Sequence, residues 1–254
     1  MNRLVSVLIL LLVPIYLSAQ EIPDFSANYL VKLNGLQAGQ LKRSLVSNPN
    51  GTRTFKSETQ AKGIFAFFKP DLVEEMSVWR HHNTLIRPES YLYQRTGGKK
   101  DKYLSLDFDW QKSQVHIDDH KQPWTLSIEE NTLDKLVYQI SLMSDLADNK
   151  SQFSYRIADG GKLKTYKIDI LTTETVTTPL GKIDAIKLIR HRAKSKGRQT
   201  ILWCAPSLNY LPIMLEHTEK GGSVFTAVLR RLDGIETKGA FEKIETRSPA
   251  FVTH

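Results

Sequence analysis

The chain has 254 residues, of which 41% are hydrophobic and 24% charged, and a formal net charge of +8 at pH 7. A chain of this length can bury a core that is stable without disulfides, and its single cysteine, Cys204, excludes an intramolecular one. Cys204 lies in the apolar run 201–205, where nothing adjacent would lower the pKa of its thiol. We therefore expect a buried thiol that packs as a small hydrophobic side chain.

The N-terminal segment 1–19 has the layout of a secretory signal peptide. Arg3 supplies a positive charge, residues 4–16 are apolar, and the small residue Ala19 precedes a polar stretch. The apolar run is shorter than the ~20 residues of a membrane span, and no later segment approaches that length. We expect cleavage after about Ala19, a periplasmic protein without a transmembrane segment, and no lipid anchor, because Gln20 is not a cysteine.

The net positive charge indicates which classes of partner an exported protein of this kind can bind. Acidic glycans, phospholipid headgroups and lipopolysaccharide are the anionic partners expected outside the cytoplasm, and nucleic acid is not. Lysines that only keep the protein soluble are the alternative explanation.

Alternation of apolar and polar residues predicts a β meander over the first half of the chain. Asn34-Gly35 is a strong hairpin signal between the first two strands, because both residues tolerate positive φ. The predicted strands cover residues 25–33, 37–46, 52–61, 72–81, 85–95, 103–110, 114–118 and 124–128.

An aromatic turn interrupts this meander at Ile64, Phe65, Phe67 and Phe68. Such a turn can fold inward and plug the end of the sheet. It can also stand exposed as a binding lip for an acyl chain or a partner, because exposed apolar patches mark interaction sites.

Residues 132–147 break the strand pattern with a single apolar helical face. Asn131 or Thr132 can cap the predicted helix, and Asp134 favours its positive N-terminus. The apolar positions are Leu133, Leu136, Val137, Ile140, Met143 and Ala147.

The second half of the chain again alternates, and its predicted strands cover residues 152–157, 164–172, 182–191, 199–204, 211–217 and 224–232. No linker separates the halves, so we expect a single β-rich domain over 20–235 and a loosely held tail over 236–254. The predicted fold class is mostly β. A large curved antiparallel sheet, like an open barrel or roll, wraps around the one helix, whose apolar face covers the concave side.

Basic residues gather at two predicted turns. Lys99 and Lys100 follow Gly97-Gly98, and Arg190 and Arg192 belong to a second basic cluster. Such tips can contact anionic headgroups or glycans through point charges or the Arg fork. With the aromatic turn they form the predicted ligand-binding set, and solvated loops are the alternative.

No catalytic signature is present, and neither a cofactor nor a metal site is predicted. The best group of metal-type ligands is His116, Asp118 and His120, for which a solvated, polar hairpin tip is the favoured explanation. Carboxylate pairs suited to glycoside hydrolysis occur at Glu74-Glu75, at Asp107 with Asp109, and at Glu129-Glu130. Asp107 and Asp109 are also explained without catalysis, as residues on the solvent-exposed face of an amphipathic strand.

Several short sequence motifs occur in a fixed order along the chain. They are Gly39, Ala61-Lys62-Gly63, Arg87-Pro88, Phe108-Asp109-Trp110, Leu133-Asp134-Lys135-Leu136, Thr178-Pro179-Leu180-Gly181-Lys182, Ile186-Lys187, Leu202-Trp203-Cys204-Ala205-Pro206 and Leu211-Pro212-Ile213. With this ordered set the chain resembles a group of exported bacterial proteins known only as a domain of unknown function. The resemblance implies a periplasmic, mostly antiparallel β fold with an embedded helix, and it supplies no activity or catalytic residue.

These features favour a non-catalytic protein that binds an amphiphilic ligand of the cell envelope, a lipid or a lipid-linked glycan, in the cleft between sheet and helix. Two alternatives stay open. One is an envelope enzyme that acts on glycans through Asp and Glu, and the other is an assembly partner of outer-membrane machinery.

Overall fold

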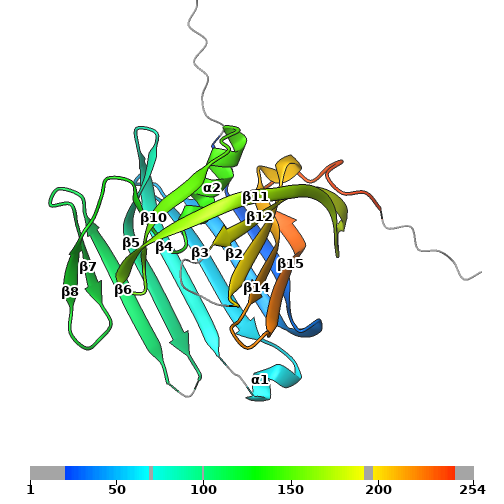
Figure 1. The fold of residues 1–254 in the computed structure, drawn as a ribbon, viewed down its shortest axis with the longest axis horizontal. Coiled ribbons are helices and arrows are strands. Elements are labelled where there is room, and N and C mark those ends of the chain that lie inside the picture. Colours follow the sequence, from blue (N-terminus) through cyan, green and yellow to red (C-terminus); the bar gives the residue numbers. More distant parts are fainter. Residues whose placement is uncertain (1–20, 69–70, 99, 192–196, 244–254) are drawn as a thin grey trace, which may run out of the picture.

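In the computed structural model, fifteen strands form one sheet that curls around a helix at one end (Figure 1). The structure describes residues 21–68, 71–98, 100–191 and 197–243. The predicted signal peptide, Lys99, Arg192 and the last part of the predicted tail lie outside these ranges.

The strands agree closely with the alternating segments of the sequence, and two α-helices and one short 3-10 helix accompany them. The elements are β1 (Phe25–Leu33), β2 (Leu36–Ser47), β3 (Arg53–Ala61), α1 (Ile64–Phe68), β4 (Leu72–His82), β5 (Leu85–Thr96), β6 (Lys102–Asp109), β7 (Gln114–Asp118), β8 (Trp124–Ser127), β9 (Thr132–Asp134), α2 (Tyr138–Ala147), β10 (Phe153–Asp159), β11 (Lys162–Thr178), β12 (Gly181–His191), β13 (Gln199–Ala205), η1 (Pro206–Leu208), β14 (Leu211–Thr218) and β15 (Val224–Asp233).

The strand order is β8-β7-β6-β5-β4-β3-β2-β1-β15-β14-β13-β12-β11-β10-β9. Neighbouring strands are antiparallel except β9 and β10, which are parallel. The first and last strands of the chain therefore pair in the middle of the sheet, and β8 and β9 are its two ends. The predicted fold class, a large curved antiparallel sheet around one helix, is confirmed.

Alternation along each strand separates a wet face from a buried one. In β3, Phe55 and Ser57 are buried, whereas Lys56 between them is exposed. The buried faces line the inside of the curl and form one hydrophobic core with the helix. Its largest fully buried side chains include Trp79 and Tyr29.

The curled sheet is held closed by the side chains of Asp134, the last residue of β9, and of Lys135 beside it, which contact β4. Ser77 on β4 donates a hydrogen bond to the carboxylate of Asp134, and Glu75 on β4 pairs with Lys135. In the described part of the chain, β8 and β9 share no backbone ladder, since they lie at opposite ends of the strand order. The barrel is therefore open.

Helix α2 begins later than the sequence predicts. Residues 132–134 form β9, and the helix starts only at Tyr138. The carboxylate of Asp134 accepts the backbone N–H groups of Leu136 (2.7 Å) and Val137 (2.8 Å), so a tight turn separates strand and helix. The apolar residues of this segment are buried whether they lie in a strand or a helix, which is why the helical spacing was misleading.

Helix α2 lies inside one end of the curled sheet (Figure 1) and buries more than one stripe. Its buried residues include Leu142 and Leu146, whereas Ala147, predicted to face the core, is exposed. Arg43 on β2 donates a hydrogen bond of 2.7 Å to the side-chain oxygen of Gln139 and so fixes the helix to the sheet. None of the helices in the described ranges is long and apolar enough to cross a membrane.

Part of the predicted tail is held by the sheet. Glu242 forms an antiparallel bridge with Lys182 at the start of β12, with N–H to O distances of 2.8 and 2.9 Å. Gly181 permits this approach, because a Cβ there would lie 2.5 Å from the carbonyl oxygen of Glu242. The sheet therefore holds the predicted tail at Glu242, and residues 244–254 lie outside the described ranges.

Candidate functional site

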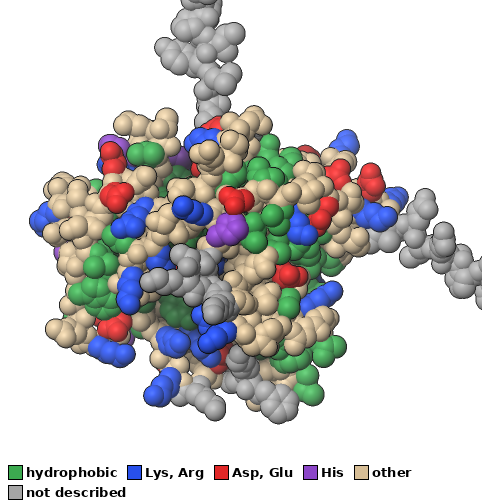
Figure 2. Space-filling model, viewed as in Figure 1, with side chains coloured by type: hydrophobic (Ala, Val, Ile, Leu, Met, Phe, Trp, Pro, Cys, Tyr) green, Lys and Arg blue, Asp and Glu red, His purple; other side chains and the backbone are tan. Residues whose placement is uncertain are grey.

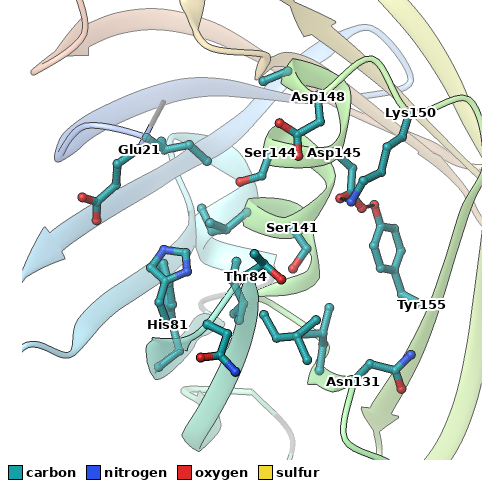
Figure 3. A pocket seen from close by; sticks show the side chains of 18 of the residues that line it. Glu21, His81, Thr84, Asn131, Ser141, Ser144, Asp145, Asp148, Lys150 and Tyr155 are labelled. Atoms are coloured by element: carbon teal, nitrogen blue, oxygen red, sulfur yellow. Dashed lines mark hydrogen bonds and ion pairs between the residues drawn. The ribbon is translucent and has the colours of Figure 1, made fainter. Parts of the chain in front are cut away.

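A cleft of about 580 Å³ lies between α2 and the β4–β5 hairpin, at the end of the barrel that the helix occupies (Figure 3). We call it the helix cleft. Strands β3 to β5 supply one wall, α2 the opposite wall, and the segment that leads into β9 supplies part of the base.

The floor of the helix cleft is apolar and rigid. It consists of the buried side chains of Ile22, Trp79, Ile86, Leu133 and Ile140, none of which is more than 7% exposed. Apart from Ile22, which precedes β1, each comes from a position where strand or helix periodicity turns the side chain inward. A floor of this kind suits the hydrocarbon part of a ligand.

The rim of the helix cleft is polar, and α2 supplies three of its residues, Ser141, Ser144 and Asp145. Ser141 and Ser144 lie on the face of the helix that borders the cleft (Figure 3). One turn further, Asp145 accepts hydrogen bonds from Lys150 (2.6 Å) and from the hydroxyl of Tyr155 (2.7 Å). Burial, and then the charge of Asp145, raise the pKa of Tyr155, so this phenol stays protonated.

The wall opposite α2 carries a buried arginine. Arg53 is 6% exposed, stacks over Trp79, and forms ion pairs with Glu21 (3.3 Å) and Asp24 (2.8 Å). Burial opposes ionisation of Asp24, but hydrogen bonds from Ser47 and Arg53 outweigh it and hold its pKa below the usual value. The cleft thus offers hydroxyls, carboxylates and cations around an apolar centre.

A second polar group lies deeper in the barrel, beside β9. Burial raises the pKa of Asp134 to about 6, although its hydrogen bonds with Ser77 and the turn lower it. Next to it, Glu75 accepts hydrogen bonds from Lys135 (2.7 Å) and from the hydroxyl of Tyr91 (2.6 Å). Burial alone would lower the pKa of Lys135, but the carboxylate of Glu75 outweighs it and raises the pKa, so the ammonium persists.

The residues of the predicted aromatic turn form the short helix α1, which is exposed. Ile64 is 67% and Phe67 is 87% exposed, whereas Phe65 is half-buried. Phe68 is the last residue of α1. The described side chains of the turn, Ile64, Phe65 and Phe67, therefore do not form an inward plug, and none of the three lines the helix cleft.

The predicted basic residues are not brought together. Lys100 is exposed near the start of β6. Arg190 does not lie at a turn tip: it lies in β12, over the ring of Tyr166 at 4.5 Å, and donates hydrogen bonds to Tyr138 (3.4 Å) and Thr200 (3.1 Å). Strand parity does not give its position clearly, because the buried residues of β12 change from odd positions (Ile183, Ala185) to an even one (Leu188).

Two of the predicted carboxylate pairs, Glu74-Glu75 and Glu129-Glu130, are divided between different surroundings. In β4, Glu75 points into the barrel, and Glu74 beside it faces the other side of the strand. Glu129 and Glu130 pair with different arginines, Arg156 (3.7 Å) and Arg87 (2.6 Å). Within the described ranges, no group of three or more His, Cys, Asp or Glu side chains is arranged to hold a metal ion.

The cysteine behaves as predicted. Cys204 is fully buried in β13, and burial raises the pKa of its thiol to about 12.

The residues that line the helix cleft were not predicted as a site. Ser141 and Ser144 interrupt the largely apolar stretch 140–146 of α2, and this is the signal that could have marked them. Trp79 shares the inner face of β4 with Glu75 and Ser77, and in the sequence it reads as an ordinary core residue.

Comparisons with solved structures support the fold. A β-barrel-like protein of domain of unknown function DUF1849 from Brucella abortus matches with a TM-score of 0.53 at 9% identity, over 85% of this chain and 99% of its own. A DUF1329 family protein from Desulfovibrio piger (TM-score 0.23, 12% identity, 85% and 86% coverage) and a chain of the MucA/MucB complex of Pseudomonas aeruginosa (TM-score 0.18, 10% identity, 87% and 92% coverage) match more weakly. Of these three, the first alone supports an argument, and it concerns the fold.

No curated protein matches the chain. The family model described as a protein of unknown function, DUF3108, matches residues 28–230, from β1 to β15. This match confirms the resemblance noted in the sequence, and the chain belongs to the DUF3108 family.

Proposed function

We propose that this protein is a non-catalytic periplasmic binding protein that holds an amphiphilic ligand of the cell envelope, a lipid or lipid-linked glycan, in the helix cleft. The observation that carries the proposal is the cleft itself, with an apolar floor under a polar rim. Its volume of about 580 Å³ lies within the ~300–1,000 Å³ that small-molecule sites occupy.

The lining supports an amphiphile over a purely polar or purely apolar ligand. A hydrocarbon chain can cover the floor around Trp79 and Ile140, where each buried CH₂ group contributes about 0.8 kcal/mol. A polar head can then stay at the rim, near the hydroxyls of Ser141 and Ser144. Neither part of such a ligand has to leave a polar group unpaired.

The periplasmic location rests on the signal-peptide layout of residues 1–19. Fractionation of the native organism, followed by the intact mass of the protein, tests it. A mature chain that begins near Gln20 in the periplasmic fraction supports the proposal, and an unprocessed cytoplasmic chain contradicts it.

Ligand binding is tested by titration with the fluorescent fatty acid 11-(dansylamino)undecanoic acid. The variant Ser141→Trp puts a large ring into the helix cleft and is expected to weaken probe binding at least tenfold. Lys42→Trp adds the same ring to the exposed outer face of β2 and should bind like the wild type. Ser144→Trp serves as a second filling variant in case the first unfolds, which circular dichroism would show.

Equal affinity of Ser141→Trp, Ser144→Trp and the wild type would overturn the helix cleft as the site. Native mass spectrometry of the protein from its own periplasm then identifies the ligand class. A bound lipid or lipid-linked glycan supports the proposal, whereas a stoichiometric protein partner without lipid favours the assembly role instead.

A further inference from the structure

A second pocket, of about 460 Å³, lies on the other side of β9 and shares no lining residue with the helix cleft. Four aromatic side chains line it: Tyr91 and Tyr93 from β5, Tyr103 from β6 and Trp124 from β8. We call it the tyrosine pocket. The three consecutive residues Leu133, Asp134 and Lys135 connect the sites, because Leu133 lines the helix cleft, Asp134 is buried between them and Lys135 lines the tyrosine pocket.

The aromatic rings of the tyrosine pocket are held in fixed orientations. Tyr103 stacks on His120 with ring centroids 3.6 Å apart and planes 10° from parallel. Trp124 donates a hydrogen bond of 3.3 Å to the carbonyl oxygen of Gly161, and a Cβ at Gly161 would lie 2.3 Å from its ring. Rings held in this way form flat surfaces that need no ordering when a ligand binds.

The charged groups of the tyrosine pocket cancel. Its lining contains three lysines and three aspartates, so its formal charge is zero, and those residues are Lys102, Lys121, Lys135, Asp101, Asp119 and Asp159. The two deepest are already paired: Lys135 contacts Glu75 at 2.7 Å, and Asp159 contacts Lys164 at 2.7 Å. An anionic ligand would meet as many carboxylates as ammonium groups and gain little net attraction.

A pocket of this kind matches a neutral ligand that is rich in hydroxyl groups. A sugar ring packs a face of C–H groups on an aromatic ring, and its hydroxyls donate to carboxylates and accept from ammonium groups. An acyl chain would cover these charged groups without offering them hydrogen bonds, which costs free energy.

We propose that the tyrosine pocket binds a neutral saccharide unit, with Tyr103 as a stacking platform and the charged lining as hydrogen-bond partners of its hydroxyls. This site is separate from the helix cleft and does not depend on the ligand proposed for that cleft.

Saturation-transfer difference NMR on the full mature chain tests this site, with maltotriose and triacetylchitotriose as neutral probes and glucose 6-phosphate as an anionic one. We expect at least one neutral probe to bind, and at least tenfold more tightly than glucose 6-phosphate. Absence of signal from both neutral probes, or tighter binding of glucose 6-phosphate, would overturn the proposal.

Substitutions then place the binding. Tyr103→Ala should lower the affinity for the bound saccharide at least tenfold, while Tyr103→Phe keeps the ring and should retain most of it. Phe67→Ala removes an exposed aromatic ring that does not line the pocket and should have no effect. Thermal melts verify that each variant is folded, and equal affinity of Tyr103→Ala and wild type contradicts the assignment.

Two further experiments are needed. The first distinguishes saccharide binding in the tyrosine pocket from ligand binding in the helix cleft, and the second identifies the source of the sugar. Ser141→Trp, which fills the helix cleft, should leave saccharide binding unchanged, and a parallel loss would contradict a separate site. Methyl and octyl β-glucoside are then compared. Equal affinities support a free glycan as the source, and tighter binding of the octyl derivative supports a glycolipid.

Discussion

Ser77 on β4 donates a hydrogen bond to the carboxylate of Asp134 on β9, and both residues are fully buried. The two strands lie far apart in the strand order, so this contact joins the folded-back end of the sheet to its middle. The other oxygen of Asp134 caps the turn that leads into α2. One carboxyl group therefore closes the barrel and positions the helix.

The first prediction concerns pH and Asp134. Its folded pKa of about 6 lies above the ordinary value of 3.8, because burial disfavours the ionised form. The stability it contributes is fully present below about pH 4 and is lost as the pH rises through about 6, by about 3 kcal/mol in total. Urea unfolding between pH 4 and 7 measures this.

Asp134→Asn is the matched variant, because an amide oxygen can still accept the N–H groups of Leu136 and Val137 without ionising. As the pH rises from 4 to 7, the unfolding free energy of the wild type should fall relative to that of the variant. Parallel curves would contradict the raised pKa. Asp134→Ala loses the cap at every pH and should cost about 1–2 kcal/mol more than Asn.

The second prediction concerns the turn between β10 and β11. Gly160 and Gly161 both have positive φ, at 61° and 72°, so alanine is strained at either position. A Cβ at Gly161 would also strike Trp124 at 2.3 Å, whereas one at Gly160 comes no closer than 3.7 Å to Lys164. Gly161→Ala should therefore cost about 1–3 kcal/mol more than Gly160→Ala in unfolding free energy. Equal costs would show that Trp124 moves aside freely.

The third prediction concerns the thiol of Cys204, which is fully buried with a pKa raised to about 12. Because the thiolate is the reactive form, the native protein should react with Ellman's reagent only as fast as it unfolds. In guanidinium chloride, one thiol per chain should react at once. Rapid labelling of the native protein would contradict this burial.

The fourth prediction concerns the anchor between sheet and helix. Gln139→Ala removes the 2.7 Å acceptor of Arg43 and leaves a buried guanidinium with a missing partner, which should cost about 1–3 kcal/mol. The double variant Arg43→Met with Gln139→Leu removes both polar groups and should cost less than the sum of the single variants. Additive costs in urea unfolding would show that the pair is not coupled.

The sequence predicted most of the strands because one face of each is buried, and alternation follows directly from that. β7 spans 114–118, the range that the alternation indicated. β9 could not be found in this way, because three residues are too few to show a period and its partner β10 comes later in the chain. The helix start was misplaced for the same reason.

The candidate sites were harder to predict than the fold. Arg190 lies in β12, where the buried residues change from odd positions (Ile183 and Ala185) to an even one (Leu188), so strand parity alone does not place it. The lining of the helix cleft likewise depends on where α2 lies in the curled sheet. Ser141 borders a cleft only because the β4–β5 hairpin stands opposite, and no local pattern encodes that distance.

The missing ladder between β8 and β9 has a mechanical consequence. A closed cylinder has a circumference fixed by its strands and their register. This sheet is instead a curled, open one. It is held closed by two side-chain contacts, that of Ser77 with Asp134 and that of Glu75 with Lys135. Breaking these two contacts removes no backbone hydrogen bond between neighbouring strands, and the short segment 128–131 still joins β8 to β9 covalently, so neither the strand order nor the connection of the two ends depends on them.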